Sequence, residues 1–228
     1  MKAKRIISLL LVVATLFSLS VFATNAAAVS LPAKGVANAQ KVKSVIQRLG
    51  YSKNHIIGLE SVITCESRFD TYSVECIYDE PFKIGHKKTV AKQCGYYVDT
   101  YTKKLGIDCP LSGHYKGGVG LLGFSRNANS ALMSFAKAKK LNWYSIDAQT
   151  AYLLGKYNNK MFAAYKKKTF KTPVSAANWL VDNLMRPSPA VAKSEKAQIK
   201  PVVQYFVSKY SSWKYNKAYA DKVIKLMK

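Results

Sequence analysis

The chain is short of acidic side chains. Twelve Asp and Glu stand against 36 Lys and Arg in 228 residues, which gives a formal net charge of +24. Apolar residues nevertheless make up 49% of the chain, enough for a hydrophobic core, so the composition excludes an intrinsically disordered protein. No Gly-X-Y period or heptad repeat occurs, which excludes a fibre. The length fits a single domain.

Arginine is scarce too: five of the basic residues are Arg and the other 31 are Lys. Lysine lacks the planar guanidinium fork that reads guanine edges. No nucleic-acid-binding motif is present, so we expect no nucleic-acid partner. A lysine-rich surface instead suits diffuse anionic polymers of a bacterial cell wall, and the alternative is that the excess lysine only keeps the protein soluble.

Metal-ligating patterns and several catalytic motifs are missing. His55, His86 and His114 are isolated and lack metal-ligand spacing, and there is no CxxC or CxxH pair. We therefore expect no metal and no cofactor, and interpret each histidine as a surface or capping residue. The absence of GxSxG, HExxH and GxxxxGK argues against an α/β-hydrolase, a zinc peptidase and a P-loop nucleotide site.

The N-terminus has the pattern of a secretory signal. Lys2, Lys4 and Arg5 precede an apolar run over 6–22, and three alanines at 26–28 suit signal peptidase. The alternative is an uncleaved membrane anchor, although the run barely reaches spanning length. We expect a signal peptide over 1–28, a linker over 29–38 and one domain over 39–228. The mature protein is then a monomer, secreted or cell-wall associated, with no stable membrane span.

Four cysteines occur within one 45-residue block: Cys65, Cys76, Cys94 and Cys109. An even number of cysteines in an exported protein predicts two disulfides, with three possible pairings. A catalytic thiol at Cys65 is the less favoured alternative. Residues 71–125, which hold most of these cysteines, are rich in Tyr, Asp and Gly and lack sustained periodicity, so they predict a loop-rich, disulfide-stapled insertion.

The rest of the chain has the apolar spacing of helices. The expected fold is all-α, with the insertion between two helical parts. Ser52, Asp147 and Thr172 are candidate N-caps, and Gly155 weakens the continuity of the helix that contains it. The predicted helices cover about 39–49, 52–69, 132–140, 147–168, 172–186, 189–210 and 215–227, with a short one near 89–104.

Half of the acidic residues fall within 60–80, which charge balance alone does not require. Glu66 stands at the end of an apolar helix, directly before the insertion. Partial burial there would disfavour its charged form and let it hold a proton near neutral pH, as a general acid in glycoside cleavage must. Asp70 and Asp79 are candidates for a second carboxylate. The alternative is that the cluster is a solvated acidic face.

Four segments, in this order and spacing, resemble the phage tail lysozyme family of peptidoglycan hydrolases over about residues 40–212. They are IIGLESVITCESRFD (56–70), GGVGLLGFS (117–125), SALMSFAKAKKLNW (130–143) and TPVSAANWLVDNLMRP (172–187).

The resemblance implies a lysozyme-like fold and assigns residues to a site. Glu66, in Glu-Ser-x-Phe, corresponds to the catalytic acid, with Ser67 helping to orient it. Residues 120–125 correspond to the family's Gly-Leu-x-Gln-Trp-Thr segment, so Phe124 and Ser125 are expected to bind sugar, Phe124 by stacking. Gly123 stands where the family has Gln and Phe124 where it has Trp, which removes one hydrogen-bonding group and reduces the stacking surface.

The sequence thus predicts a secreted muramidase that cleaves the bond between N-acetylmuramic acid and N-acetylglucosamine, with peptidoglycan and anionic wall polymers as partners. Three alternatives stay open. They are a lytic transglycosylase that acts on the same bond, a wall-binding protein with weakened catalysis, and a membrane-active protein whose basic C-terminal segment lies on anionic lipid. For that segment an ordinary packing helix is the favoured interpretation.

Overall fold

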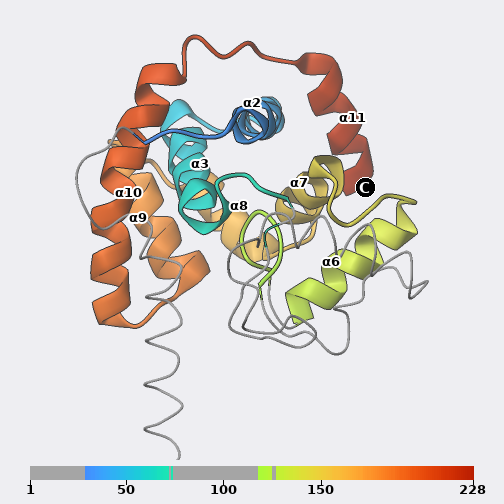
Figure 1. Ribbon diagram of the computed structural model, residues 1–228, viewed down its shortest axis with the longest axis horizontal. Helices are drawn as coiled ribbons and strands as arrows, with labels where there is room; N and C mark the ends of the chain where they lie inside the picture. The colour runs from blue at the N-terminus through green and yellow to red at the C-terminus, as the bar shows by residue number, and fades with distance from the viewer. Residues whose placement is uncertain (1–28, 72, 74–117, 125–126) are drawn as a thin grey trace, which may run out of the picture.

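The structure is a computed structural model that describes residues 29–71, 73, 118–124 and 127–228. Within these residues every regular element is helical, apart from one isolated antiparallel bridge between Val119 and Phe124. The predicted all-α fold is confirmed for this part of the chain (Figure 1). The helix expected near 89–104 lies outside it. The helices are α2 (Ala33–Arg48), α3 (Lys53–Ser67), α6 (Asn127–Ala138), α7 (Ile146–Gly155), α8 (Asn159–Lys167), α9 (Pro173–Leu180), η3 (Val181–Met185), α10 (Pro189–Lys209) and α11 (Lys217–Met227).

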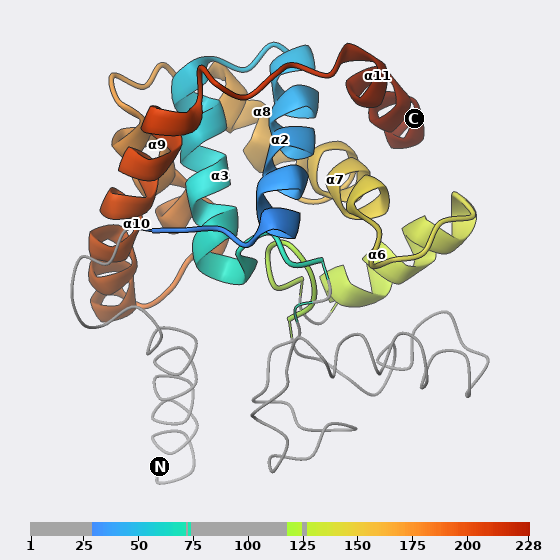
Figure 2. The ribbon, with the colours of Figure 1, turned by 45° about the horizontal axis from the view of Figure 1, so that its top comes forward.

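Helix α3 is the central element, packed against α2, α9 and α10 (Figure 2). The broad apolar face expected from the sequence is buried: Ile56, Ile57, Leu59 and Ile63 are each 0% exposed. Gly58 permits the closest contact, because a Cβ there would stand 2.8 Å from the Ala176 Cβ of α9. Only a glycine lets α9 approach α3 so closely.

Helix α2 begins at Ala33, inside the segment that we expected to be a linker. Val42, Val45 and Ile46 recur at helical spacing and are fully buried, as predicted. No helix in the described ranges combines the length and apolarity required to cross a bilayer.

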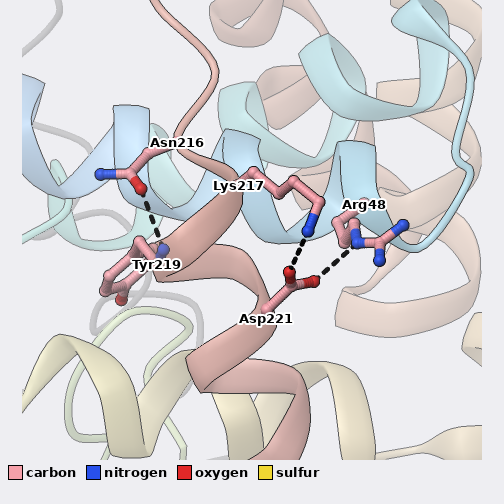
Figure 3. A network of polar contacts seen from close by, with 5 residues as sticks. All are labelled: Arg48, Asn216, Lys217, Tyr219 and Asp221. Carbon is pink, nitrogen blue, oxygen red and sulfur yellow. Dashed lines mark hydrogen bonds and ion pairs between the residues drawn. The ribbon is translucent and has the colours of Figure 1, made fainter.

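Helix α11 is a packing helix and lies against α2 and α7. Figure 3 shows the polar contacts at its start. The Asp221 carboxylate lies 2.7 Å from Arg48 Nε of α2 and 2.7 Å from Lys217 Nζ. The Asn216 side chain accepts from the Tyr219 amide at 2.9 Å and caps the helix. The favoured interpretation of the basic C-terminal segment therefore agrees with the structure.

The single helix predicted over 147–168 is two helices. α7 ends at Gly155, and Asn158 adopts a left-handed conformation (φ 52°) before α8 begins. Gly155 also explains the packing of α11, since a Cβ there would stand 2.8 Å from Met227 Cβ. The predicted weakness of the helix at Gly155 is confirmed.

The N-cap of α7 is Ser145 rather than Asp147. The Ser145 hydroxyl accepts from the Ala148 amide at 3.1 Å. Asp147 instead binds α11, through Lys222 Nζ at 2.6 Å and the Tyr219 hydroxyl at 2.9 Å. The Asp147 side chain therefore forms tertiary contacts with α11 instead of the N-cap that the local sequence suggested.

Helix α9 begins as the sequence predicted. Thr172 and Ser175 form a reciprocal capping box, and Pro173 occupies the first turn. α9 then widens into the π-helix η3, which ends at Arg186. The expected end of the segment at Arg186-Pro187 is confirmed.

Ser52 does not cap α3 through a backbone amide. Its hydroxyl lies 2.6 Å from His55 Nδ1, and the other ring nitrogen of His55 lies 2.9 Å from the Tyr165 carbonyl. His55 is only 5% exposed, so the expected surface or capping role is wrong. Its ring packs edge-on against Tyr165 and Phe170, which the spacing of histidines could not indicate. His86 and His114 lie outside the described residues.

Candidate active site

The candidate acid, Glu66, lies in the last turn of α3 and is partly buried. Helix α3 stops because Arg68 and Phe69 both have positive φ (54° and 61°), which turns the chain away from the helix axis. Glu66 is therefore held by a helix whose other residues form the core, and it faces the loop 118–124. Its Oε2 atom lies 3.7 Å from the point where a Cβ would stand on Gly123.

The loop 118–124 is fastened to α3 by Ser67. The Ser67 hydroxyl is buried and donates to the Leu121 carbonyl at 2.9 Å, with a second carbonyl, that of Ile63, at 3.3 Å. The role expected for Ser67, orienting the acid, thus takes an indirect form here: Ser67 fixes the loop beside Glu66.

Gln149 of α7 fastens the same loop from the other side. Its side chain is fully buried, accepts from the Leu121 amide at 2.9 Å and donates to the Thr71 carbonyl at 2.8 Å. Gln149 therefore joins the loop to the chain that leaves α3. Sequence analysis missed this residue, and a polar side chain among the apolar positions of a helix was the only signal that it is buried.

Phe124 does not present the expected stacking surface. The residue is 1% exposed, and its ring packs edge-on against Tyr152 and Tyr157, with centroids 5.3 and 5.1 Å apart. The Val119–Phe124 bridge turns this ring into the core. The prediction that Phe124 stacks on a sugar is therefore wrong for this conformation. Ser125, the other predicted sugar-binding residue, lies outside the described residues.

The Tyr157 hydroxyl lies within electrostatic reach of both Glu66 and Arg186. Burial raises the pKa of its hydroxyl, the Glu66 carboxylate raises this pKa further, and Arg186 lowers it. Tyr157 is half-buried and contacts Phe124, the neighbour of Gly123. Tyr157 thus packs against the loop beside Glu66, and its hydroxyl senses the charges of both Glu66 and Arg186.

The expected second carboxylates are not brought together with Glu66 by a shared helix face. α3 ends before Asp70, whose amide donates to the Ser67 carbonyl at 2.9 Å as part of the turn. Asp79 lies outside the described residues.

Glu195 of α10 is a carboxylate that the sequence did not single out. It occupies the buried stripe of α10 between Val191 and Ile199, and burial raises its pKa to about 7. Both Glu66 and Glu195 raise the pKa of the Cys65 thiol, after burial itself, so both carboxylates lie within electrostatic reach of Cys65. Glu195 lies four residues from Val191 and four from Ile199, and this helical spacing was the signal in the sequence that Glu195 shares their buried face.

Cys65 carries a free thiol in the structure, and burial raises its pKa to about 12. The predicted disulfide at this position is not supported, because the side chain packs against the core at the end of α3. A thiol that holds its proton so firmly is also a poor nucleophile. Cys76, Cys94 and Cys109 lie outside the described residues.

Glu60, another member of the acidic cluster, is not part of a solvated face. It is 0% exposed, and no described residue hydrogen-bonds either carboxylate oxygen. Burial raises its pKa well above the usual range, and the nearby Lys43 ammonium opposes that rise. Lys43 itself donates to the carbonyls of Tyr210 and Trp213, at 2.9 and 2.6 Å. The interpretation as a solvated acidic face is therefore wrong for Glu60.

No group of three or more His, Cys, Asp or Glu side chains among the described residues is arranged to hold a metal ion. The chemistry available at the site is proton transfer by carboxyl groups, with a tyrosine and a guanidinium nearby.

Comparison with known proteins identifies the family of the chain. A search of curated proteins found no match. The family model for phage tail lysozyme matches residues 37–210, which include α3 with Glu66, the loop 118–124 and α9. This match covers most of the chain, and the family indicates a lysozyme-like peptidoglycan hydrolase. The chain belongs to the phage tail lysozyme family.

Proposed function

We propose that the protein is a secreted muramidase in which Glu66 is the general acid. The substrate is the bond between N-acetylmuramic acid and N-acetylglucosamine in peptidoglycan. The observation that carries this proposal is the position of Glu66: a partly buried carboxyl at the end of the central helix, with Oε2 3.7 Å from the Cβ position of Gly123 in a loop held by Ser67 and Gln149.

In this proposal Glu66 gives its proton to the glycosidic oxygen as the bond to the anomeric carbon breaks. Such an acid must carry its proton before the reaction begins. The rigid attachment of both α3 and the loop keeps the carboxyl in place, which is how positioning contributes to catalysis.

The group that captures the oxocarbenium-like centre decides the reaction type. A hydrolase needs a second group to activate or accommodate water. Glu195, whose pKa burial raises to about 7, joins Asp70 and Asp79 as a candidate for this second carboxylate. If no second carboxylate is needed, a hydroxyl of the muramic acid attacks instead and leaves an anhydro end, as in a lytic transglycosylase.

The lysine-rich composition supports attachment to the anionic wall outside the producing cell. A net charge of +24 attracts polyanions at long range, and the attraction weakens as salt screens it. We expect wall binding to fall between 50 mM and 500 mM NaCl, and binding that does not change with salt would contradict the role of lysine.

The test of the function is muropeptide analysis by mass spectrometry after digestion of purified wall. Wild-type protein is expected to release fragments with reducing muramic acid ends, and Glu66→Gln is expected to release none. Asp221→Asn is a matched control, because it removes a carboxylate at the distant contact between α2 and α11. Anhydro ends would identify a transglycosylase. Full cleavage by Glu66→Gln would remove Glu66 from the acid role.

A wall-binding protein is the second candidate, and two observations favour it. Phe124 is buried, and Gly123 offers no side chain beside the acid. Intact glycan after prolonged digestion, combined with co-sedimentation of the protein with wall, would identify this function.

A further inference from the structure

A second feature of the site is a guanidinium at the end of η3. α9 widens into the π-helix Val181–Met185, and Arg186 follows in the left-handed region with φ 51° and ψ 46°. Its amide donates to the Val181 carbonyl at 2.9 Å. Glycine or asparagine is the usual residue at such a helix end, because other side chains are strained there. Wide π-turns within helices occur frequently at functional sites.

The Arg186 side chain is exposed but held in a defined orientation. Its Nε donates to the Asn183 carbonyl at 3.0 Å, and the Asn183 side chain donates to the Trp179 carbonyl at 2.8 Å. No described residue bonds the two terminal nitrogens of the guanidinium. One edge of the planar group is thus anchored, and the nitrogens that form paired contacts with a carboxylate are left for a ligand.

The packing of the helices brings this group toward the acid. Gly58 of α3 contacts Ala176 and Ala177 of α9, and both η3 and α10 pack with α9. The last turn of α3 and the connection from η3 to α10 lie at the same end of the helical bundle (Figure 2). The hydroxyl of Tyr157 lies within electrostatic reach of both Glu66 and Arg186.

We propose that Arg186 is a binding subsite for a carboxylate of the substrate, and that it selects acidic glycan over neutral glycan. The inference rests on the proposed function, because it assumes that glycan lies beside Glu66. Muramic acid carries a lactyl group whose carboxylate is free in peptide-free glycan. In peptide-bearing glycan the carboxylates are those of the stem peptide. Both sources present the same planar group to the guanidinium, whereas an N-acetylglucosamine polymer has none.

The test compares binding of three soluble glycans to proteins that carry Glu66→Gln, so that no ligand is cleaved. The glycans are a peptide-bearing muramyl oligosaccharide, the same oligosaccharide after amidase treatment, and a β-1,4-linked N-acetylglucosamine oligomer of equal length. Adding Arg186→Gln is expected to weaken binding of at least one muramyl ligand about tenfold or more, the loss expected for a charge-assisted contact. The neutral oligomer is expected to bind as before.

Two further variants keep the result interpretable. Lys200→Gln removes the same charge from an exposed position on α10 and measures the effect of net charge alone. Arg186→Lys keeps the charge without the planar fork and should restore binding only in part. The muramyl ligand that loses affinity identifies the lactyl or the peptide carboxylate as the partner.

Equal losses in Arg186→Gln and Lys200→Gln would overturn the proposal, and so would an equal loss for the neutral oligomer, which would indicate a structural role. Failure of the proposed function can be distinguished from failure of the carboxylate subsite. If wild-type protein leaves wall glycan intact but the muramyl ligands still bind through Arg186, the carboxylate subsite stands without the reaction.

Discussion

Glu66 Oε2 and the vacant Cβ position of Gly123 are 3.7 Å apart, so the loop approaches the acid within ordinary contact distance. A small side chain fits there without overlap. Gly123→Ala is therefore expected to fold and to lose only about 1 kcal/mol of stability from the left-handed backbone (φ 55°).

Gly120→Ala is the matched comparison, because Gly120 has a similar backbone (φ 70°) in the same loop. A Cβ at this position would overlap the buried amide of Gln149. Overpacking adds to the backbone strain, so we expect a loss of about 3 kcal/mol. Urea denaturation measures both variants. Equal losses would contradict the placement of the loop.

Gln149→Ala is expected to lower the free energy of unfolding by about 3 kcal/mol, because it leaves the Leu121 amide and the Thr71 carbonyl buried without partners. The lysis rate should fall with it, because the loop beside Glu66 loses the attachment made by Gln149 and keeps only those made by the Ser67 hydroxyl and the Ser73 carbonyl, which accepts from the Gly120 amide at 2.8 Å. Gln198→Ala is the control, because the Gln198 side chain hydrogen-bonds to Ser194 within its own helix. A fully active, fully stable Gln149→Ala variant would show that the contacts of Ser67 and Ser73 are enough to hold the loop.

The buried Glu60 carboxyl is expected to make the free energy of unfolding depend on pH. Its pKa is raised well above the model-compound value of 4.5 in the folded protein. The folded state therefore holds a proton that the unfolded chain releases, and the stabilising effect is complete below pH 4.5 and is lost as the pH rises toward the folded pKa. One such group contributes at most about 1.4 kcal/mol per pH unit. Glu60→Gln should remove this slope, and an unchanged slope in thermal unfolding at several pH values would contradict the assignment.

Glu195 makes the same kind of contribution over a narrower range. Its folded pKa of about 7 limits the loss of stability to the interval between about pH 4.5 and pH 7. Glu195→Gln is therefore expected to flatten the pH dependence in that interval and to leave it unchanged above pH 8. Thermal unfolding of the two single variants and the double variant separates the contributions. If Glu195→Gln changed the stability only at alkaline pH, the pKa of about 7 assigned to Glu195 would be wrong.

Cys65 is expected to react slowly with iodoacetamide in the folded protein. With a pKa of about 12, only about one thiol in 10,000 is ionised at pH 8, and the thiolate is the reacting species. Peptide mapping should find Cys65 unmodified under native conditions and alkylated in urea without a reductant. A disulfide-linked Cys65 peptide in the non-reduced map would contradict the free thiol.

Local sequence predicted the helices because apolar spacing and caps are local signals. The face of α3 with Ile56, Ile57 and Ile63 and the start of α9 at Thr172 are examples. The break after Gly155 was only suggested, because it depends on how closely Met227 packs against it.

The site was less predictable, since its contacts join residues far apart in the chain. Glu66 follows from the Glu-Ser motif. The burial of Phe124, however, depends on Tyr152 and Tyr157, and the role of Gln149 depends on a loop 28 residues earlier. The position of Arg186 requires α9 to pack beside α3, which no periodicity specifies.

The location of the acid on α3 has a consequence for protein engineering. Most side chains of that helix fill the interior, so mutations close to Glu66 on its own helix risk unfolding the domain. Two residues on other segments are free of this constraint: Gly123 has room for an added side chain, and Arg186 is exposed. Libraries that aim to change which glycan is accepted should therefore randomise these two positions and leave the helix that carries the acid untouched.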